Sequence, residues 1–455
     1  MYPLCRLARR GSSALILIFA SSMPVLADGW QAGVARVNIT PQKPMWMSGY
    51  ASRDRPADGK LTDLWAKALV LEDARGKHAV LVTIDLVGID RELSQEVCRQ
   101  LEETHHLPRA AIALATSHTH TGPVVRGNLA PMYGLDDEQQ QLIDAYGEEL
   151  EHKLVAVVGY AFKDLKPARL AWGTGNATFA VNRRNNPENE VVERRAAGKL
   201  VGPTNHDVPT LAVFGADDAL RAVVFGYACH ATVLSDFVWS GDWPGFAQIE
   251  LERRHPGTVA LFWAGCGADQ NPLPRRTVEL AQDYGRQIAD AVDAVLAQPM
   301  KPIDPRIEVA YEEIDLAFSE LPTKEKLTTE AAVDDYAGRR AKLLLAQWEN
   351  EGELRASYPY PVQAWQLGND LVGIFLGGEV VVDYSIRLKR ELAPRPVWVA
   401  GYSNDVMAYI PSRRVLEEGG YEGGGAMVYY GLPAPWAADV EERIVAKSLE
   451  LASSR

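Results

Sequence analysis

Short apolar segments alternate with longer helical patterns along this chain, and this alternation most constrains its fold. Strands are indicated where β-branched residues cluster between Gly, Asp or Pro. These segments are 69–71, 79–84, 111–115, 211–214, 222–227, 259–263 and 371–376. Apolar residues recur at steps of three and four in 91–105, 138–161 and 278–297, which indicates amphipathic helices. The alternation predicts an α/β fold with a mixed β-sheet core covered by helices.

The chain is expected to form one large domain over residues 28–455. It has 455 residues and 47% hydrophobic content, which is ample for one buried core. No internal repeat and no long linker marks a boundary. Residues 325–353 are charged and predict a helical excursion with a solvated face, while Pro, Gly and Asn in 182–203 predict a surface loop.

The N-terminus has the pattern of a signal peptide over residues 1–27. Arg6, Arg9 and Arg10 precede a short apolar run, and the segment ends in Val-Leu-Ala at Ala27. The apolar run is too short to span a bilayer, so no transmembrane anchor is expected. The pattern predicts cleavage after Ala27 and a periplasmic or secreted protein.

Charge and cysteine content narrow the function classes. The formal net charge is −13, and the predicted signal segment removes three arginines and no acid. Such a balance argues against nucleic acid or an anionic membrane as a tight partner.

Three cysteines, Cys98, Cys229 and Cys266, remain in the mature chain. They permit one Cys229–Cys266 disulfide or, alternatively, buried thiols.

The segment Ser-His-Thr-His-Thr-Gly-Pro at 117–123 directly follows a predicted strand. In an extended chain, His118 and His120 project to one face because side chains alternate. Imidazole is a common zinc ligand. Taken alone, the motif is about equally consistent with metal binding and with a structural role.

Four further segments place polar residues directly after strands or in tight loops. Each also has a structural interpretation: a hydrogen-bonded histidine, a polar helix cap, a buried carboxylate with satisfied partners, or core tyrosines. The candidate residues are His230, Asp269 and Gln270, Glu379, and Tyr409 with Tyr421.

Taken together, these motifs resemble the neutral/alkaline non-lysosomal ceramidase family, specifically its N-terminal catalytic domain. The resemblance covers nearly all of the mature chain. It is carried by 32–41, 47–51, 118–123, 181–183, His230, 240–242, 378–379, Asn404, 409–410 and 421–423.

The resemblance implies a zinc site and a set of catalytic groups. Its zinc ligands fall on His118, His230, Glu379 and Tyr409, with one zinc ion per chain. It also implies that His120 and Arg183 hold the scissile amide or its oxyanion, with Tyr421 as a hydrogen-bond donor. A cation and neutral donors aimed at a developing oxyanion make chemical sense.

The sequence departs from the family pattern in two places. The family's catalytic loop carries Gly-Asp-x-Ser-Pro-Asn, whereas residues 267–272 read Gly-Ala-Asp-Gln-Asn-Pro. Gln270 stands at the serine position, so the chain is interpreted as a divergent member. A zinc-activated water with Asp269 as base and Gln270 as oxyanion donor is the expected substitute. The family's C-terminal β-sandwich domain is expected to be absent.

The leading interpretation is an exported zinc-dependent hydrolase that acts as an amidase on an acyl-amide. One alternative is a zinc-dependent carbohydrate-active enzyme, either a deacetylase or a polysaccharide lyase, whose sugar site tryptophans would line. A second is a non-catalytic metal- or ligand-binding homologue. The substrate is then a small molecule, lipid or glycan, and the oligomeric state stays open. The tryptophans are Trp46, Trp172, Trp239 and Trp243.

Overall fold

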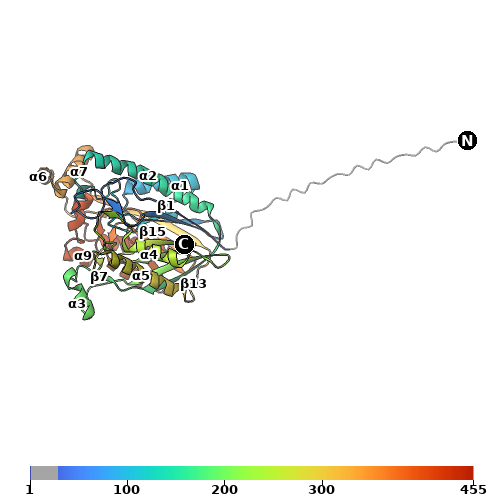
Figure 1. Cartoon of the computed structure of the whole chain (residues 1–455). Helices are drawn as coiled ribbons and strands as arrows, with labels where there is room; N and C mark the ends of the chain where they lie inside the picture. Colours follow the sequence, from blue (N-terminus) through green and yellow to red (C-terminus); the bar gives the residue numbers. More distant parts are fainter. Residues whose placement is uncertain (2–28, 454–455) are drawn as a thin grey trace.

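The computed structural model describes Met1 and residues 29–453 (Figure 1). The predicted signal peptide, residues 1–27, lies outside the described residues apart from Met1, so its cleavage stays a prediction. Among residues 29–453, no helix combines the length and the apolar character that crossing a bilayer requires.

The larger of the two main sheets has nine strands and is mixed. Its order is β11-β9-β8-β6-β1-β3-β4-β5, and β13 pairs with β6 beside this path. The outer pairs β4–β5 and β9–β11 are parallel, whereas the inner pairs are antiparallel. This confirms the predicted mixed sheet. The strands are β1 (Trp30–Asn38), β3 (Trp65–Glu72), β4 (His78–Ile84), β5 (Ile112–Thr116), β6 (Lys166–Asn176), β8 (Asp207–Gly215), β9 (Leu220–Tyr227), β11 (Val259–Ala264) and β13 (Lys301–Pro302).

A second sheet of four strands packs against one face of the larger sheet. Because side chains alternate along a strand, Leu69 of β3 joins the core that contains Trp365, whereas Val70 joins the helical core with Leu93 and Leu150. This second sheet is an addition to the predicted architecture. Its order is β14 (Ile307–Ala317), β15 (Ser357–Leu367), β16 (Leu371–Leu376) and β18 (Val397–Ala400).

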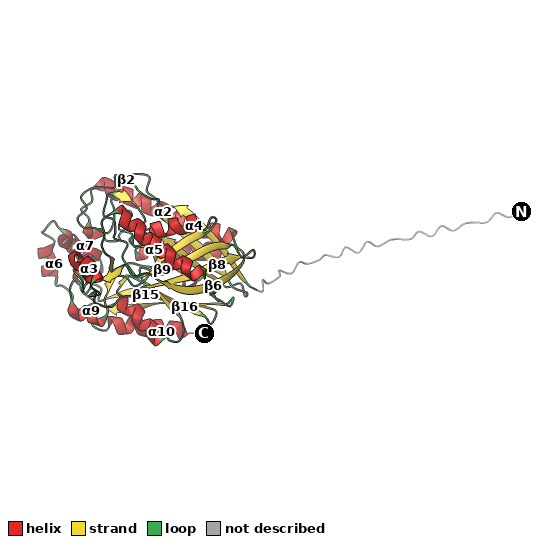
Figure 2. Cartoon of the chain, turned by 60° about the horizontal axis from the view of Figure 1, so that its bottom comes forward, coloured by secondary structure: helices red, strands yellow, loops and turns green. Residues whose placement is uncertain are grey.

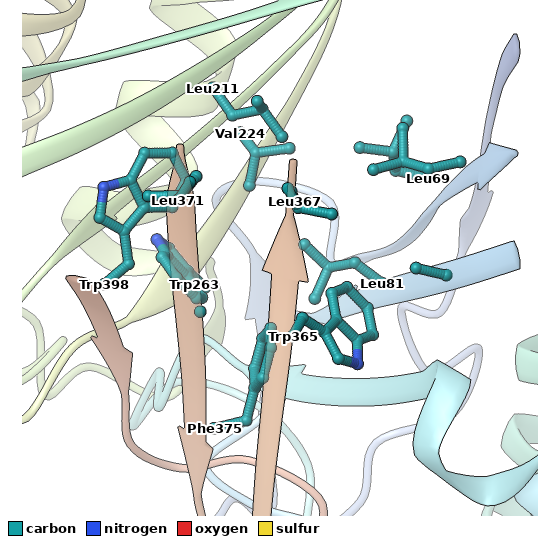
Figure 3. Close-up of a pocket in the computed structure, with 13 residues that line it drawn as sticks. Leu69, Leu81, Leu211, Val224, Trp263, Trp365, Leu367, Leu371, Phe375 and Trp398 are labelled. Atoms are coloured by element: carbon teal, nitrogen blue, oxygen red, sulfur yellow. The ribbon is translucent and has the colours of Figure 1, made fainter. Parts of the chain in front are cut away.

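The packing of the two sheets leaves a cavity of about 40 Å³ (Figure 3). Its lining is almost wholly apolar and includes Trp263, Trp365 and Trp398. The indole N–H of Trp263 is buried with no hydrogen-bond partner among the described residues. The lining contains none of the predicted site residues, so this cavity is a feature of core packing.

Helices cover the outer faces of both sheets, which gives four layers (Figure 2). The helices α1, α2, α4 and α5 pack on the larger sheet, and α8 and α10 pack on the smaller one. Asp90, Asp136 and Thr277 each begin a helix by accepting a backbone N–H. The bounds are α1 (Arg91–His105), α2 (Asp137–Lys163), α4 (Asp242–Arg254), α5 (Val278–Leu296), α8 (Val382–Glu391) and α10 (Val440–Ser453).

Two surface segments differ from their predictions in detail. The excursion at 325–353 is two helices, α6 (Lys324–Glu330) and α7 (Tyr336–Glu351), because Asp335 caps a new helix by accepting from the backbone of Gly338. The predicted loop at 182–203 contains the short α3 (Val191–Ala196), since Val191 packs into a small core with Leu273.

The remaining elements are short, and several of them position the site. Three two-stranded pairs form, β2 with β10, β7 with β12, and β17 with β19. These elements are β2 (Gly59–Lys60), β7 (Ala180–Asn182), β10 (Val238–Trp239), β12 (Gln270–Pro272), β17 (Glu379–Val380), β19 (Tyr409–Ile410), α9 (Arg413–Glu418), η1 (Arg109–Ala111), η2 (Ala130–Met132), η3 (Glu188–Glu190) and η4 (Gly425–Tyr430).

The three cysteines of the described residues are buried free thiols. Of the two alternatives for Cys229 and Cys266, the structure therefore has the thiols and not the disulfide.

Candidate metal centre and active site

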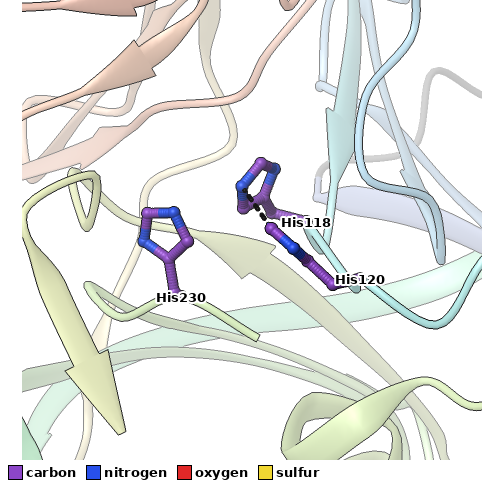
Figure 4. A group of neighbouring side chains, drawn as sticks. All are labelled: His118, His120 and His230. Atoms are coloured by element: carbon purple, nitrogen blue, oxygen red, sulfur yellow. Dashed lines mark hydrogen bonds between the residues drawn. The ribbon is translucent and has the colours of Figure 1, made fainter. Parts of the chain in front are cut away.

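Three histidines meet beyond the carboxyl ends of β5 and β9 (Figure 4). The segments that follow these strands pair once more, through Thr119 and Ala231. The condition of an extended chain is not met, because His118 has a left-handed backbone with φ of 58°. This turn, rather than strand alternation, brings the Nε2 atoms of His118 and His120 to 3.1 Å.

Backbone carbonyls fix the orientations of His118 and His230. Nδ1 of His118 lies 2.6 Å from the carbonyl of Val87, and Nδ1 of His230 lies 2.9 Å from that of Gly267. A carbonyl can only accept, so each neutral ring carries its proton on Nδ1 and a lone pair on Nε2. Both Nε2 atoms lie 3.1 Å from Oε2 of Glu379. Metal-ligating histidines characteristically donate their other N–H in this way.

Glu379 and Tyr409 are direct partners in the β17–β19 pair. Glu379 follows Gly378, whose φ of 72° and close contact with Ala408 leave no room for a side chain. The Tyr409 hydroxyl lies 3.3 Å from Nε2 of His230. This register carries two residues from distant parts of the sequence to the histidines.

The donor atoms of the four predicted ligands therefore form one connected group. Neighbouring donor atoms lie 3.1 to 3.3 Å apart. Ligands at about 2.0–2.1 Å from a tetrahedral zinc ion would be separated by roughly 3.3–3.4 Å. The buried group of His118, His120 and His230 could hold a metal ion, since its nitrogens all lie within 4.8 Å of one another.

Burial and neighbouring charges set the protonation of the centre. Burial, together with the Arg183 cation, lowers the pKa of His230 to about 4. Burial and the two other imidazoles hold the pKa of His120 well below its usual value. Burial therefore favours the uncharged forms of His120 and His230 at neutral pH.

His120 differs from the other two histidines in the partners of its ring. Its Nδ1 is buried and has no hydrogen-bond partner among the described residues. Gly49 makes room for the ring, because a Cβ there would lie 2.5 Å from this nitrogen. The buried Arg53 donates to the carbonyls of His120, at 2.8 Å, and Ser48, at 2.6 Å. The backbone of His120 is therefore held while one ring nitrogen stays available.

Arg183 connects the centre to the protein surface. It donates through Nη2 to the Tyr409 hydroxyl at 3.2 Å and through Nε to Glu422 at 2.7 Å. Its guanidinium carbon lies 5.7 Å from the ring centroids of both Tyr409 and Tyr421, whose rings pack 5.1 Å apart. The structure thus brings the predicted Arg183 and Tyr421 to the edge of the centre.

Asp269 and Gln270 make hydrogen bonds to the protein framework. The Asp269 carboxylate accepts from the first backbone N–H of α8 at 2.9 Å and from Asn182 at 3.0 Å, and burial raises its pKa to about 6. The Gln270 amide donates to the carbonyl of Ala228 and accepts from the backbone of Asn205. Among residues 29–453, neither side chain hydrogen-bonds to the histidines. Their roles as base and oxyanion donor stay predictions.

Sequence reasoning missed Tyr430. Its hydroxyl donates to Oε1 of Glu379, the oxygen that does not face the histidines. Its ring also packs 6.5 Å from that of Tyr409. Tyr430 follows Tyr429 in η4, and no pattern in the sequence distinguishes the two tyrosines.

The turn at 240–245 supports the backbone of His230. Asp242 accepts from the backbone amides of Leu234 and Trp243. The Trp243 indole then donates to the carbonyl of His230 at 2.8 Å. This turn therefore holds the backbone of one predicted ligand.

The family described as neutral/alkaline non-lysosomal ceramidase, N-terminal, matches residues 30–265. The chain belongs to this family. Its match includes His118, His120, Arg183 and His230. Glu379 and the tyrosines of this ceramidase-family protein lie beyond the matched residues, so their place at the centre is a finding of the structure.

Individual relatives are distant and longer than the matched region. The neutral ceramidase of Pseudomonas aeruginosa is 27% identical over 275 residues, which cover 56% of this chain and 40% of that protein. Neutral ceramidase A of Dictyostelium discoideum is 26% identical over 255 residues, which cover 52% of this chain and 34% of that protein. The matches thus span 40% or less of these relatives.

Solved structures show the same fold. The crystal structure of neutral ceramidase from Pseudomonas aeruginosa has a TM-score of 0.72 at 19% identity, covering 93% of this chain and 74% of that chain. A structure described as ceramidase complexed with C2 also has a TM-score of 0.72, at 17% identity, covering 93% of this chain and 75% of that chain. The likeness confirms the predicted α/β fold class.

Proposed function

We propose that this ceramidase-family protein is a zinc-dependent hydrolase that cleaves the C–N bond of an acyl-amide. Family membership supports a hydrolase of the amidase type. The observation that carries the zinc site is the meeting of four donor groups at one buried point. These groups are His118, His230, Glu379 and Tyr409.

The residues present fit a divalent cation. Two imidazole lone pairs and a carboxylate oxygen at 3.1 Å repel one another, and a cation at their centre removes that repulsion. Nitrogen and oxygen donors of this kind suit zinc. When bound, zinc would supply a water of lowered pKa and would polarise the scissile carbonyl.

The groups around the centre can position and protonate the substrate. His120 places its Nε2 3.1 Å from that of His118, so this ring can donate a hydrogen bond at the centre. Arg183 donates to the Tyr409 hydroxyl, so its positive charge is aimed at the place where negative charge develops on the substrate oxygen. The Tyr421 hydroxyl has no partner among the described residues and can donate to the same oxygen.

Asp269 and Gln270 are assigned a positioning role in this proposal. The backbone carbonyl of Asp269 accepts from the backbone N–H of Arg183 at 2.8 Å. Gln270 pairs with Asn182 in the β7–β12 pair, directly before Arg183. Both residues therefore hold the segment from which the Arg183 side chain extends.

Metal content and amide turnover together test the proposal. The chain would be loaded with zinc, and both quantities measured for the wild type, His118→Ala and a control, His255→Ala, whose ring pairs with Asp293 outside the centre. About one zinc per chain and amine release are expected in the wild type and control, and both are lost in His118→Ala. Zinc binding without turnover of any amide would instead indicate a binding protein.

We also propose that the chain is exported. The charged, apolar and small-residue pattern of residues 1–27 supports this, independently of the fold. N-terminal sequencing of the protein recovered from its native cell would test it, and a mature start at Asp28 is expected.

A further inference from the structure

A cavity of about 590 Å³, lined by charged side chains together with a similar share of apolar surface, lies beside the candidate centre. Arg183 and Tyr421, two groups at the edge of that centre, also line this cavity, so it opens next to the reacting position. Its volume falls within the range of about 300–1,000 Å³ that is common for small-molecule sites. We call it the Arg–Glu pocket; its lining is Arg183, Arg184, Asn186, Glu188, Asn271, Leu273, Arg275, Glu418, Gly419, Gly420, Tyr421 and Glu422.

The buried side of the Arg–Glu pocket is a chain of ion pairs. Glu422 accepts from Nε of Arg183 at 2.7 Å and from Nη1 of Arg184 at 2.6 Å. Arg184 also pairs with Glu418 at 3.1 Å. The charges of these groups balance one another before any ligand enters, while the buried Nε of Arg184 has no hydrogen-bond partner among the described residues.

A separate two-point ion pair forms another part of the wall. Arg275 donates to both carboxylate oxygens of Glu188, at 2.9 and 2.6 Å. The lining therefore carries three arginines and three glutamates, and its formal charge is balanced.

Several donors in the Arg–Glu pocket still lack partners within the described residues. They are the Tyr421 hydroxyl, Nδ2 of Asn271, Nη1 of Arg275 and Nε of Arg184. The Tyr421 side chain is 44% exposed, so its ring also offers an apolar face to a ligand. Hydrogen-bond donors and carboxylate acceptors thus surround the exposed ring of Tyr421.

This chemistry discriminates among three classes of ligand. An alkyl chain would cover charged groups without replacing their hydrogen bonds to water, which is costly. An anion would meet three carboxylates that already neutralise the arginines. A hydroxyl group both donates and accepts, so adjacent hydroxyls can bridge a guanidinium and a carboxylate.

We infer that the Arg–Glu pocket binds a neutral, polyhydroxylated ring of the substrate, such as a sugar carrying the scissile acyl-amide. The inference rests on the proposed function and names its substrate class. The aromatic face of Tyr421 contacts the C–H groups of the ring, while the ion pairs hold its hydroxyls. Hydrolysis adds water across the C–N bond and releases a carboxylic acid and the amino sugar.

Matched amides test this substrate class on the zinc-loaded full chain. The β1,4-linked dimer of N-acetylglucosamine, N-acetylsphingosine and N-hexylacetamide share one acyl group and differ in the amine. We expect kcat/KM for the sugar amide to exceed that for N-hexylacetamide by at least about tenfold, from several added hydrogen bonds. A preference for either of the two alkyl-bearing amides would overturn the inference.

A pocket variant separates recognition from chemistry. Arg275→Gln removes one pocket cation that makes no contact with the centre, and it should lower kcat/KM for the sugar amide about three- to tenfold while leaving N-hexylacetamide unchanged. Arg253→Gln is the matched control, because Arg253 pairs with Glu250 on the exposed face of α4. Equal effects of Arg275→Gln on both amides would contradict the pocket assignment.

A binding measurement keeps the two proposals apart. Cellobiose has no amide, so its binding by titration calorimetry does not depend on hydrolysis. Saturable binding that Arg275→Gln weakens supports the pocket assignment even where no amide is cleaved, and that combination would refute only the proposed function. Amide cleavage without binding of any tested saccharide at about 10 mM would refute only the sugar inference.

Discussion

The histidine centre and the Arg–Glu pocket lie on two sides of Arg183 and handle polar groups in opposite ways. In the centre, His118 and His230 use their Nδ1 protons on backbone carbonyls and turn bare lone pairs toward Glu379. In the pocket, each arginine already has a carboxylate partner. The centre thus gathers lone pairs and a carboxylate, whereas the pocket balances its positive and negative charges.

This difference suits the histidine centre to the chemical step and the Arg–Glu pocket to substrate recognition. Electron-pair donors that meet in one place suit a positive ion, whereas balanced ion pairs favour a ligand that both donates and accepts hydrogen bonds. Arg183 belongs to both regions, through the Tyr409 hydroxyl and through Glu422. Variants in the centre should therefore change zinc binding and turnover, whereas variants in the Arg–Glu pocket should change substrate preference.

The largest effect on turnover is expected at the shared residue. Arg183→Gln should lower kcat/KM about 100- to 1,000-fold, because a donor aimed at the developing oxyanion is lost. Zinc content should stay at the wild-type level, since Arg183 donates to Tyr409 but is not itself a ligand. Turnover within about tenfold of the wild type would remove Arg183 from the chemical step.

Asp269 offers a pH test of the framework under both regions. Burial raises its folded-state pKa to about 6, above the unfolded value, so the folded state binds the proton more tightly. The resulting stabilisation is complete below about pH 4, is lost as the pH rises through about 6, and is on the order of 3 kcal/mol.

The measurement is urea unfolding of the wild type and Asp269→Asn across this pH range. The difference between their free energies of unfolding should change with pH, because the amide cannot titrate. A difference that is constant with pH would mean that Asp269 does not titrate as described. Unchanged amide turnover in Asp269→Asn would also exclude the predicted base role.

A smaller effect, confined to the centre, is expected from Tyr430→Phe. Loss of its hydrogen bond to Glu379 should weaken zinc affinity or activity about 10- to 100-fold, as for other groups that orient metal ligands. Zinc affinity would be measured by competition with a chelator. Tyr429→Phe is the matched control, since Tyr429 packs against Tyr336 and makes no contact with Glu379; equal losses in both variants would argue against this role.

The smallest effect is expected at the outer rim of the pocket. The Glu418 side chain is 42% exposed, and its ion pair with Arg184 is screened by water, so Glu418→Gln should cost less than about 1 kcal/mol of unfolding free energy.

Glu422 is the buried counterpart for this comparison. It is 5% exposed and pairs with two arginines, so Glu422→Gln should cost about 3–5 kcal/mol of unfolding free energy. Equal losses of unfolding free energy in Glu418→Gln and Glu422→Gln would show that burial does not set the strength of these ion pairs.

Much of the fold follows from local sequence patterns. The helix expected at 91–105 matches α1, and the strand expected at 371–376 matches β16. These patterns are strong because each element packs an apolar face or is buried on both faces. The second sheet was not foreseen as a separate layer, because alternation along a strand does not say what covers each face.

The candidate site was predictable only where a residue follows a strand or stands in a family motif. His118, His230, Glu379 and Tyr409 do meet, but the left-handed turn at His118 and the register of Glu379 with Tyr409 depend on tertiary contacts. Tyr430 carries no sequence signal, because its role exists only through its position beside Glu379.

Because β17 pairs with β19, an ion bound at the centre would also connect distant parts of the chain. Its donors come from two segments of the larger layer and from two segments near the end of the chain, so an ion held by all four would act as a cross-link between them. A cross-link over so long a stretch of chain removes much of the freedom of the unfolded state. Free zinc would then raise the melting temperature and slow proteolysis of the linked segments, even in the absence of substrate.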